Sequence, residues 1–286
     1  MSTHDRRLHA FRPDLADVRL RDSVEAMRFV AGRPARIVVP CAAMRGAPDA
    51  AASQVSQLLL GDDVLVFDEA AGFAWVQAER DSYVGYVAAD AIGGRGSQAT
   101  HCVAVPRTFL YPGADLKLPH AGVLPMGAAV AITGTAVTRG TDYSLLADGG
   151  AVVSSHLRPA HEHAADFVAV AETFLHTPYL WGGTSGLGID CSGLVQTAMR
   201  MAGRHVLRDT DMQAGTIGEP VEPGPGLSGL RRGDLVFWKG HVAIMTDANS
   251  TIHANGHTMM VSREPLAAAV ERIAYLYGPP SGFRRV

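Results

Sequence analysis

The chain has 286 residues, of which 47% are hydrophobic and 19% charged, and its formal net charge is −3. This composition is typical of a folded globular protein with two or three domains, and the small net charge argues against a nucleic-acid partner or an anionic membrane surface. The three cysteines, Cys41, Cys102 and Cys191, lie at wide spacings that form neither a disulfide framework nor a zinc pattern. We therefore expect a reducing compartment.

The N-terminal segment, residues 1–32, is polar, and we expect an arm with one helix over roughly residues 15–30. It carries a charge every few residues and lacks the apolar core of a signal peptide. No later stretch has the uninterrupted apolar length that a membrane helix needs. If Met1 is the true start, we expect a soluble, cytoplasmic protein without membrane insertion.

Residues 33–95 have the pattern of a small all-β unit. The short runs "ARIVVP", "DDVLVFDE", "FAWVQAE" and "SYVGYVAADAI" are rich in β-branched and aromatic residues and are separated by turn residues. Such regularly spaced short runs predict strands joined by tight turns.

Residues 98–160 repeat this pattern after the linker "GGRGSQAT" (93–100). One shift of 66 residues aligns three separate pairs of positions: Pro40 with Pro106, Gly61 with Gly127, and Tyr86 with Val152. A single shift that aligns several strand-like segments predicts a tandem duplication.

The pattern changes again from about residue 161. An amphipathic helix is predicted over 164–176, a second helix over 191–203, and then a Gly/Pro-rich loop over 218–233. The strand-like runs "DLVFW", "HVAIMTD", "TIHANG" and "MMVSRE" follow. Helices first and an antiparallel meander after them indicate an α+β domain.

Cys191 lies in "GIDCSGLVQTAMRMAG" (188–203), where the second predicted helix begins. The positive end of the helix dipole and unpaired backbone N–H groups favour a thiolate there. A lone cysteine is more often a small buried hydrophobic residue, so the assignment depends on its partners.

Two histidines supply the partners that a thiol nucleophile needs. His241 and His253 are 12 residues apart, which is enough for one strand, a turn and the return on a neighbouring strand. Adjacent antiparallel strands would place the imidazoles side by side, and the Cys191 helix would pack against that sheet. We predict Cys191 as nucleophile, His241 as base and later acid, and His253 as the residue that orients His241.

Two alternatives apply to these residues. Each histidine alone is also compatible with an ordinary polar residue on a half-buried strand, because the chain has 12 histidines. A zinc site formed by Cys191, His241 and His253 would need a further ligand, and the paired spacing of known zinc motifs is absent. We expect no metal and no cofactor.

Four motifs in order resemble the catalytic domain of the NlpC/P60 family of cysteine peptidases over residues 161–286. They are "PYLWGGTSGLGIDCSGLVQ", "RRGDLVFW", "GHVAIM" and "IHANG". The two β-units resemble bacterial SH3-like domains, which accompany this domain in the subfamily that cleaves γ-D-glutamyl–diamino acid bonds. The resemblance implies two small all-β SH3-like barrels followed by an α+β papain-like catalytic domain.

The resemblance also implies substrate contacts near the nucleophile. Tyr179 is similar to the family tyrosine whose hydroxyl lies beside the thiol. Asp190 would meet the free amine of an N-terminal L-alanine, and Ser192 would contact D-glutamate. Thr210 occupies a substrate-contact position that is often serine.

In the subfamily, an acid and a tyrosine of the first SH3-like domain close one end of the cleft. Asp62 in "LLGDD" and Tyr83 in "SYVGY" match these places, although glutamate is more usual than aspartate. Tyr83 is equally compatible with a strand aromatic in a small barrel. The second unit has Ala128 and Gly149 at the matching positions, so we expect it to be structural.

These residues predict a cytoplasmic cysteine endopeptidase. Its substrates would be peptidoglycan-derived tri- or tetrapeptides with a free N-terminal L-alanine, cut between γ-D-glutamate and the diamino acid during cell-wall recycling. The alternatives are a wall hydrolase or amidase, an acyltransferase on the same scaffold, or a non-catalytic wall-binding protein. The complete Cys–His–His set argues against the last of these.

Overall fold

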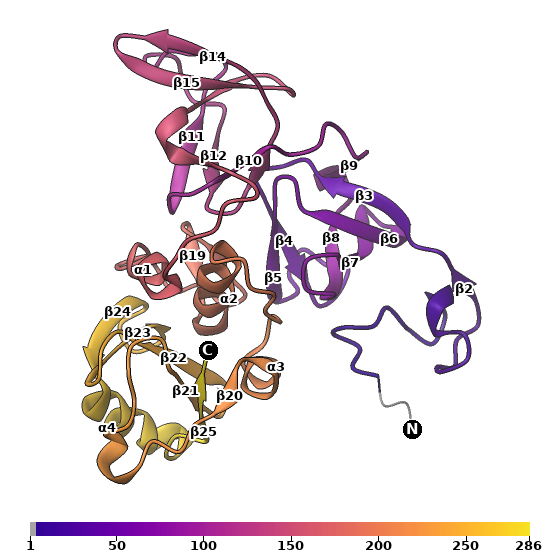
Figure 1. Cartoon of the computed structure of the whole chain (residues 1–286). Helices are drawn as coiled ribbons and strands as arrows, with labels where there is room; N and C mark the ends of the chain where they lie inside the picture. The colour runs from indigo at the N-terminus through magenta and orange to yellow at the C-terminus, as the bar shows by residue number, and fades with distance from the viewer. Residues whose placement is uncertain (1–3) are drawn as a thin grey trace. The chain divides into compact units, whose positions relative to one another are not determined.

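A computed structural model describes residues 4–286, and the chain divides into two compact units, Met1–His161 and Glu162–Val286 (Figure 1). None of the helices in this described range is both long and apolar enough to cross a bilayer.

The prediction of a helix over residues 15–30 is wrong. This segment contains β1 (Ala16–Asp17), the 3₁₀ turn η1 (Val18–Leu20) and β2 (Phe29–Val30), and β1 pairs with β2 in parallel. Leu15 is fully buried in a cluster with Phe67 and Trp75 of the following β-unit. Tertiary packing therefore overrides the local helical periodicity. The first three residues of the expected arm lie outside the described range.

The first β-unit is one antiparallel seven-stranded sheet with strand order β5-β4-β8-β7-β6-β3-β9. Buried and less buried side chains alternate along its strands, as expected for a sheet with one face on a core. Its elements are β3 (Arg33–Ile37), β4 (Cys41–Arg45), β5 (Gln54–Leu59), β6 (Asp63–Ala70), β7 (Phe73–Ala78), β8 (Val84–Ala88), η2 (Ala89–Ala91) and β9 (Ile92–Gly93).

The elements of the second β-unit follow one another along the chain in the same order as those of the first unit. They are divided among three small antiparallel sheets, β13-β10-β17, β11-β12 and β14-β15-β16. Gly61 and Gly127 occupy equivalent turns, and both have φ of 87°, a conformation that favours glycine. Its elements are β10 (His101–Val103), β11 (Arg107–Leu110), β12 (Gly122–Pro125), β13 (Ala129–Val130), β14 (Ile132–Thr138), β15 (Thr141–Leu146), β16 (Ala151–Val153), η3 (Ser154–His156) and β17 (Leu157–Pro159).

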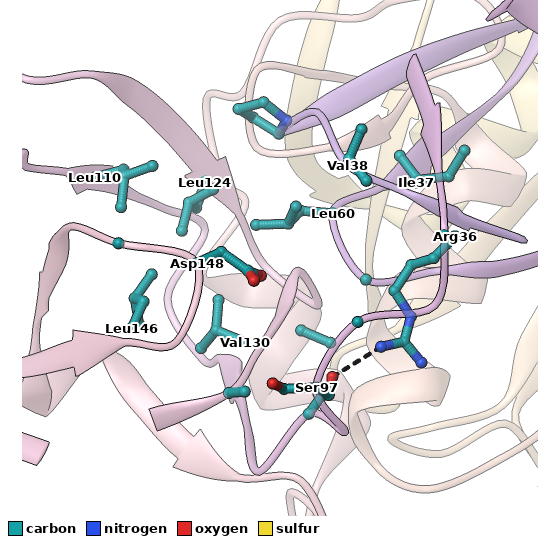
Figure 2. A pocket seen from close by; sticks show the side chains of 18 residues that line it. Arg36, Ile37, Val38, Leu60, Ser97, Leu110, Leu124, Val130, Leu146 and Asp148 are labelled. Atoms are coloured by element: carbon teal, nitrogen blue, oxygen red, sulfur yellow. Dashed lines mark hydrogen bonds between the residues drawn. The ribbon is translucent and has the colours of Figure 1, made fainter. Parts of the chain in front are cut away.

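The two β-units share a hydrophobic cluster, in which Leu59 packs with Val103 and Leu124. Beside it lies a cavity of about 380 Å³, into which Leu110, Leu124 and Val130 project (Figure 2). At its edge Arg36 donates a hydrogen bond to the carbonyl of Ser97 at 2.9 Å. None of the residues that line this cavity is a predicted site residue.

The C-terminal unit has the predicted order of helices followed by an antiparallel meander. Its sheet has the order β20-β25-β21-β22-β23-β24. The helices are α1 (Phe167–Glu172), α2 (Cys191–Met201), α3 (Thr210–Thr216) and α4 (Leu266–Tyr277). The strands are β18 (Thr184–Ser185), β19 (Gly188–Ile189), β20 (Glu219–Pro220), β21 (Leu235–Trp238), β22 (His241–Met245), β23 (Ser250–Asn255), β24 (Met260–Pro265) and β25 (Gly282–Arg285), and η4 covers Pro225–Leu227.

Two helices of this unit pack on the sheet. Helix α2 lies against β22 and β23 and is buried almost throughout (Figure 1). Helix α4, which the sequence patterns did not predict, packs Leu266, Ala269 and Ile273 against a core that contains Trp238. Helix α1 is shorter than the expected 164–176. The sheet therefore holds α2 over the strands that carry the two histidines.

Candidate active site

Cys191 is the first residue of α2, as the sequence predicted. Asp190 caps the helix, because its side chain accepts a hydrogen bond from the backbone N–H of Gly193 at 2.7 Å. Gly193 lies so close to the loop before the helix that a Cβ there would be 2.1 Å from the carbonyl oxygen of Gly183. The start of α2, and with it the thiol, is thus fixed by backbone packing.

The Cys191 sulfur faces a cavity of about 480 Å³ that His241 and Tyr179 also line. Its thiol donates toward the carbonyl oxygen of Gly240 at 4.0 Å, and the Thr210 hydroxyl lies 3.9 Å from the sulfur. The further side chains around the cavity include the polar or aromatic Trp181, Asn255, His257, Arg272 and Tyr277 and the aliphatic Ile273 and Leu276. Asp190, Ser192 and Thr210 are not part of this lining.

The two imidazoles lie side by side on the adjacent strands β22 and β23, as predicted. His241 Nε2 and His253 Nδ1 are 2.8 Å apart, and the ring centroids are 5.0 Å apart. His241 therefore has only Nδ1 left for the thiol.

The relay continues beyond the predicted residues. His253 Nε2 lies 2.7 Å from Glu264 Oε1, and Arg272 of α4 donates to the same carboxylate oxygen. Glu264 follows from the strand pairing, because Thr251 pairs with Glu264 and His253 lies two residues further along the same face. The alternation in "MMVSRE" could have indicated this, but no sequence signal indicated Arg272.

Burial shifts the pKa values of Cys191 and His241 in the directions that favour their neutral forms. It raises the pKa of the Cys191 thiol to about 11, and the negative charge of Asp190 adds to this. Burial also lowers the pKa of His241 to about 3, with help from the charge of Arg272. Desolvation therefore opposes the resting thiolate that the helix N-terminus was expected to favour.

The Asp190 carboxylate is buried and accepts hydrogen bonds from several donors. It accepts from Gly182 N at 2.9 Å and from both terminal nitrogens of Arg208, at 3.1 and 2.7 Å. Arg208 is 1% exposed and also donates to the Ser192 hydroxyl at 2.7 Å. Sequence reasoning missed Arg208, although it lies two residues before Thr210. The pair leaves the start of α2 without net charge.

The remaining predicted residues lie in different surroundings. Burial, together with the charges of Cys191 and Asp190, raises the pKa of Tyr179, so its hydroxyl is neutral. Asp62 accepts from Leu59 N at 2.8 Å and forms a 2.7 Å ion pair with Arg80. Tyr83 is buried just ahead of β8. A contact of Asp62 or Tyr83 with a peptide stays a prediction.

In the part of the chain that the structure describes, no set of ligands supports the zinc alternative. Among residues 4–286, no group of three or more His, Cys, Asp or Glu side chains is arranged to hold a metal ion. His241 and His253 instead use ring nitrogens on each other. The groups that the structure brings together here are one thiol and two imidazoles.

Comparison with known families places both parts of the chain. Residues 176–272 match the NlpC/P60 family, and residues 44–92 match the bacterial dipeptidyl-peptidase Sh3 domain. The chain thus combines a β domain of the Sh3 class with a peptidase domain. Its C-terminal unit belongs to the NlpC/P60 family.

Curated relatives carry peptidase names. A dipeptidyl-peptidase 6 of Lysinibacillus sphaericus is 30% identical over 136 residues, which cover 44% of this chain and 49% of that protein. A gamma-D-glutamyl-L-lysine dipeptidyl-peptidase of Bacillus subtilis (strain 168) is 33% identical over 99 residues, 32% of either protein. The matched stretch spans half or less of the length of these relatives.

Solved structures show the same fold. An NlpC/P60 family protein from Bacillus cereus ATCC 10987 superposes with a TM-score of 0.73 at 21% identity, covering 88% of this chain and 99% of that one. An NlpC/P60 endopeptidase from Photobacterium damselae subsp. piscicida gives 0.60 at 14% identity, covering 88% of this chain and 71% of that one. At these identities the likeness concerns the fold alone.

Proposed function

We propose that the protein is a cysteine endopeptidase that cuts the bond between γ-D-glutamate and the diamino acid of peptidoglycan-derived tri- or tetrapeptides. The observation that carries the proposal is the Cys191 thiol in one cavity with His241, whose Nε2 lies 2.8 Å from His253 Nδ1. The substrate class is supported by the name of the Bacillus subtilis relative, a gamma-D-glutamyl-L-lysine dipeptidyl-peptidase. Three free cysteines suit action in a reducing cytoplasm during wall recycling.

The reaction starts from a neutral thiol and a neutral imidazole. His241 Nδ1 takes the proton of Cys191 as the sulfur attacks the γ-carbonyl carbon of D-glutamate, so no resting ion pair is required. The proton then passes to the leaving amine of the diamino acid, and a thioester remains on Cys191. Water, deprotonated by His241, hydrolyses the thioester. First-turn N–H groups of α2 stabilise the oxyanion in both steps.

Four residues around the nucleophile bind the peptide in this proposal. Tyr179 lines the cavity that the sulfur faces, and the Thr210 hydroxyl lies 3.9 Å from the sulfur. The neutral state of Tyr179 lets its hydroxyl donate a hydrogen bond. Asp190 and Ser192 receive the amine of L-alanine and the D-glutamyl group. Since Arg208 already neutralises Asp190, the ammonium competes with a strong partner.

The β-units take supporting roles in the proposal. Asp62 and Tyr83 of the first unit are the residues proposed to contact the free amine of the peptide. The second unit is a duplicated SH3-like domain with a structural role. The duplication is supported by its elements, which follow the same order as those of the first unit, and by the equivalent turns at Gly61 and Gly127.

The test is hydrolysis of L-Ala-γ-D-Glu-diaminopimelate and its L-lysine analogue, followed by mass spectrometry. Release of L-Ala-D-Glu by the wild type and none by Cys191→Ala is expected. Acetylation of the L-alanine amine should lower kcat/KM by at least about tenfold, because Asp190 loses an ammonium partner. Equal rates on the free and acetylated peptides, or cleavage of intact peptidoglycan only, would overturn the proposal and favour a wall hydrolase.

A further inference from the structure

Glu264 and Arg272 extend the histidine relay beyond the groups that react. The His253 side chain is fully buried, and its Nε2 lies 2.7 Å from Glu264 Oε1. Arg272 donates to the same oxygen from α4, a different element. A carboxylate and a guanidinium that converge on a buried imidazole can decide which nitrogen of that ring carries a proton.

We infer that Glu264 is a positioning residue that sets the tautomers of both histidines, so that His241 presents an unprotonated Nδ1 to Cys191. An ionised carboxylate only accepts hydrogen bonds, so His253 Nε2 must carry the proton. A neutral His253 then has a bare Nδ1, which can only accept. His241 Nε2 must therefore be the donor across the 2.8 Å contact. Neutral His241 keeps its lone pair on Nδ1.

The charge state of Glu264 supports this chain of donors. Burial alone would raise the pKa of Glu264, but the hydrogen bonds from His253 and Arg272, with the charge of Arg272, bring it below its usual value. Arg272 has donors only, so it cannot supply the acceptor that a protonated Glu264 would need. The carboxylate thus stays an acceptor at neutral pH.

The opposite tautomer would be inactive. If His253 carried its proton on Nδ1, it would donate to His241 Nε2, and the proton of His241 would sit on Nδ1. A protonated Nδ1 cannot take the thiol proton, although every heavy atom remains in place. In the serine proteases, the wrong tautomer of the base lowers kcat by about 10⁴-fold. Glu264 acts one residue further from the reaction, so that value is an upper limit here.

Two substitutions of Glu264 distinguish the effect of its hydrogen-bond acceptor from the effect of its negative charge. Glu264→Met removes the acceptor at similar size, whereas Glu264→Gln keeps an amide oxygen to which His253 and Arg272 can donate. Glu172→Met is the matched control, because Glu172 forms an ion pair with Arg232 in the same unit, away from the relay. Thermal unfolding of each variant shows whether it is folded.

The first readout is long-range ¹H–¹⁵N NMR of histidine-labelled protein without substrate. In the wild type and in Glu264→Gln, His241 should carry its proton on Nε2, and in Glu264→Met a substantial fraction should move to Nδ1. The His253→Asn spectrum assigns the signals. A wild-type His241 protonated on Nδ1, or no change in Glu264→Met, would overturn the inference.

The second readout is activity, which rests on the proposed function. In Glu264→Met, kcat should fall by at least about tenfold at unchanged KM, while Glu264→Gln and Glu172→Met stay near wild type. In a His253→Asn background, Glu264→Met should cost nothing further, because the Asn oxygen accepts from His241 Nε2 unaided. Additive losses would overturn the inference. A wild type that cleaves no peptide would refute the proposed function and leave the NMR result standing.

Discussion

The neutral resting state of Cys191 predicts slow alkylation by iodoacetamide. Below its pKa a thiol reacts in proportion to its thiolate fraction. For a pKa of about 11, that fraction at pH 7 is ~0.01%. An unperturbed thiol with a pKa of roughly 8.5 is ~3% ionised, about 300-fold more. A more basic thiolate is also more nucleophilic, which raises the rate per thiolate by about tenfold. Cys191 should therefore react roughly thirtyfold more slowly than an unperturbed thiol.

The assay is peptide mapping by mass spectrometry after timed exposure to iodoacetamide. Cys41 and Cys102 are partly exposed and serve as internal references in the same sample. Between pH 7 and pH 9 the rate at Cys191 should rise by about 100-fold, because each pH unit below the pKa gives tenfold more thiolate. Alkylation of Cys191 that is faster than at both references and flat from pH 5 to 8 would refute the reasoning. It would show a thiolate–imidazolium pair at rest.

Three further changes test the site. His253→Asn should retain far more activity than His253→Ala, because an amide oxygen still accepts from His241 Nε2–H; the reverse order of kcat would contradict its orienting role. Arg208→Met should lower the free energy of unfolding by about 3–5 kcal/mol, because it leaves Asp190 buried and unpaired. Urea unfolding should show partial recovery with Asp190→Asn added, and no recovery would contradict the pairing. The pKa of His241, lowered to about 3, makes its neutral form a condition of folding. Stability should therefore fall as pH drops from about 6.5 toward 3, and less so in His241→Asn; equal acid sensitivity in calorimetry would contradict this.

Much of the reacting geometry could be predicted from the sequence, because it depends on local pattern. Helical periodicity placed Cys191 at the start of α2, and two alternating runs placed His241 and His253 on neighbouring strands. These positions follow from backbone periodicities that a few residues determine. The bonds that tune the site, such as Arg208 with Asp190, join separate elements and leave no periodic signal.

Predictions that ignored burial were wrong. The helix expected over 15–30 gave way to short strands because Leu15 packs with Phe67 and Trp75. Burial opposes the expected thiolate, because the helix that presents Cys191 is buried on nearly every side. Desolvation and tertiary packing are properties of the assembled domain, so no window of sequence reports them.

The contact between Gly193 and Gly183 constrains how this site can change through evolution or design. Both glycines are locked by backbone atoms, since a Cβ at Gly183 would lie 2.4 Å from the carbonyl oxygen of Gly188 and one at Gly193 would lie 2.1 Å from that of Gly183. Backbone, unlike a flexible side chain, cannot move aside for a larger residue. Substitutions at Gly183 and Gly193, beside the nucleophile, are therefore not available for changing specificity. Substitutions remain available at Leu276 and Tyr277 of α4, two exposed residues that line the same cavity.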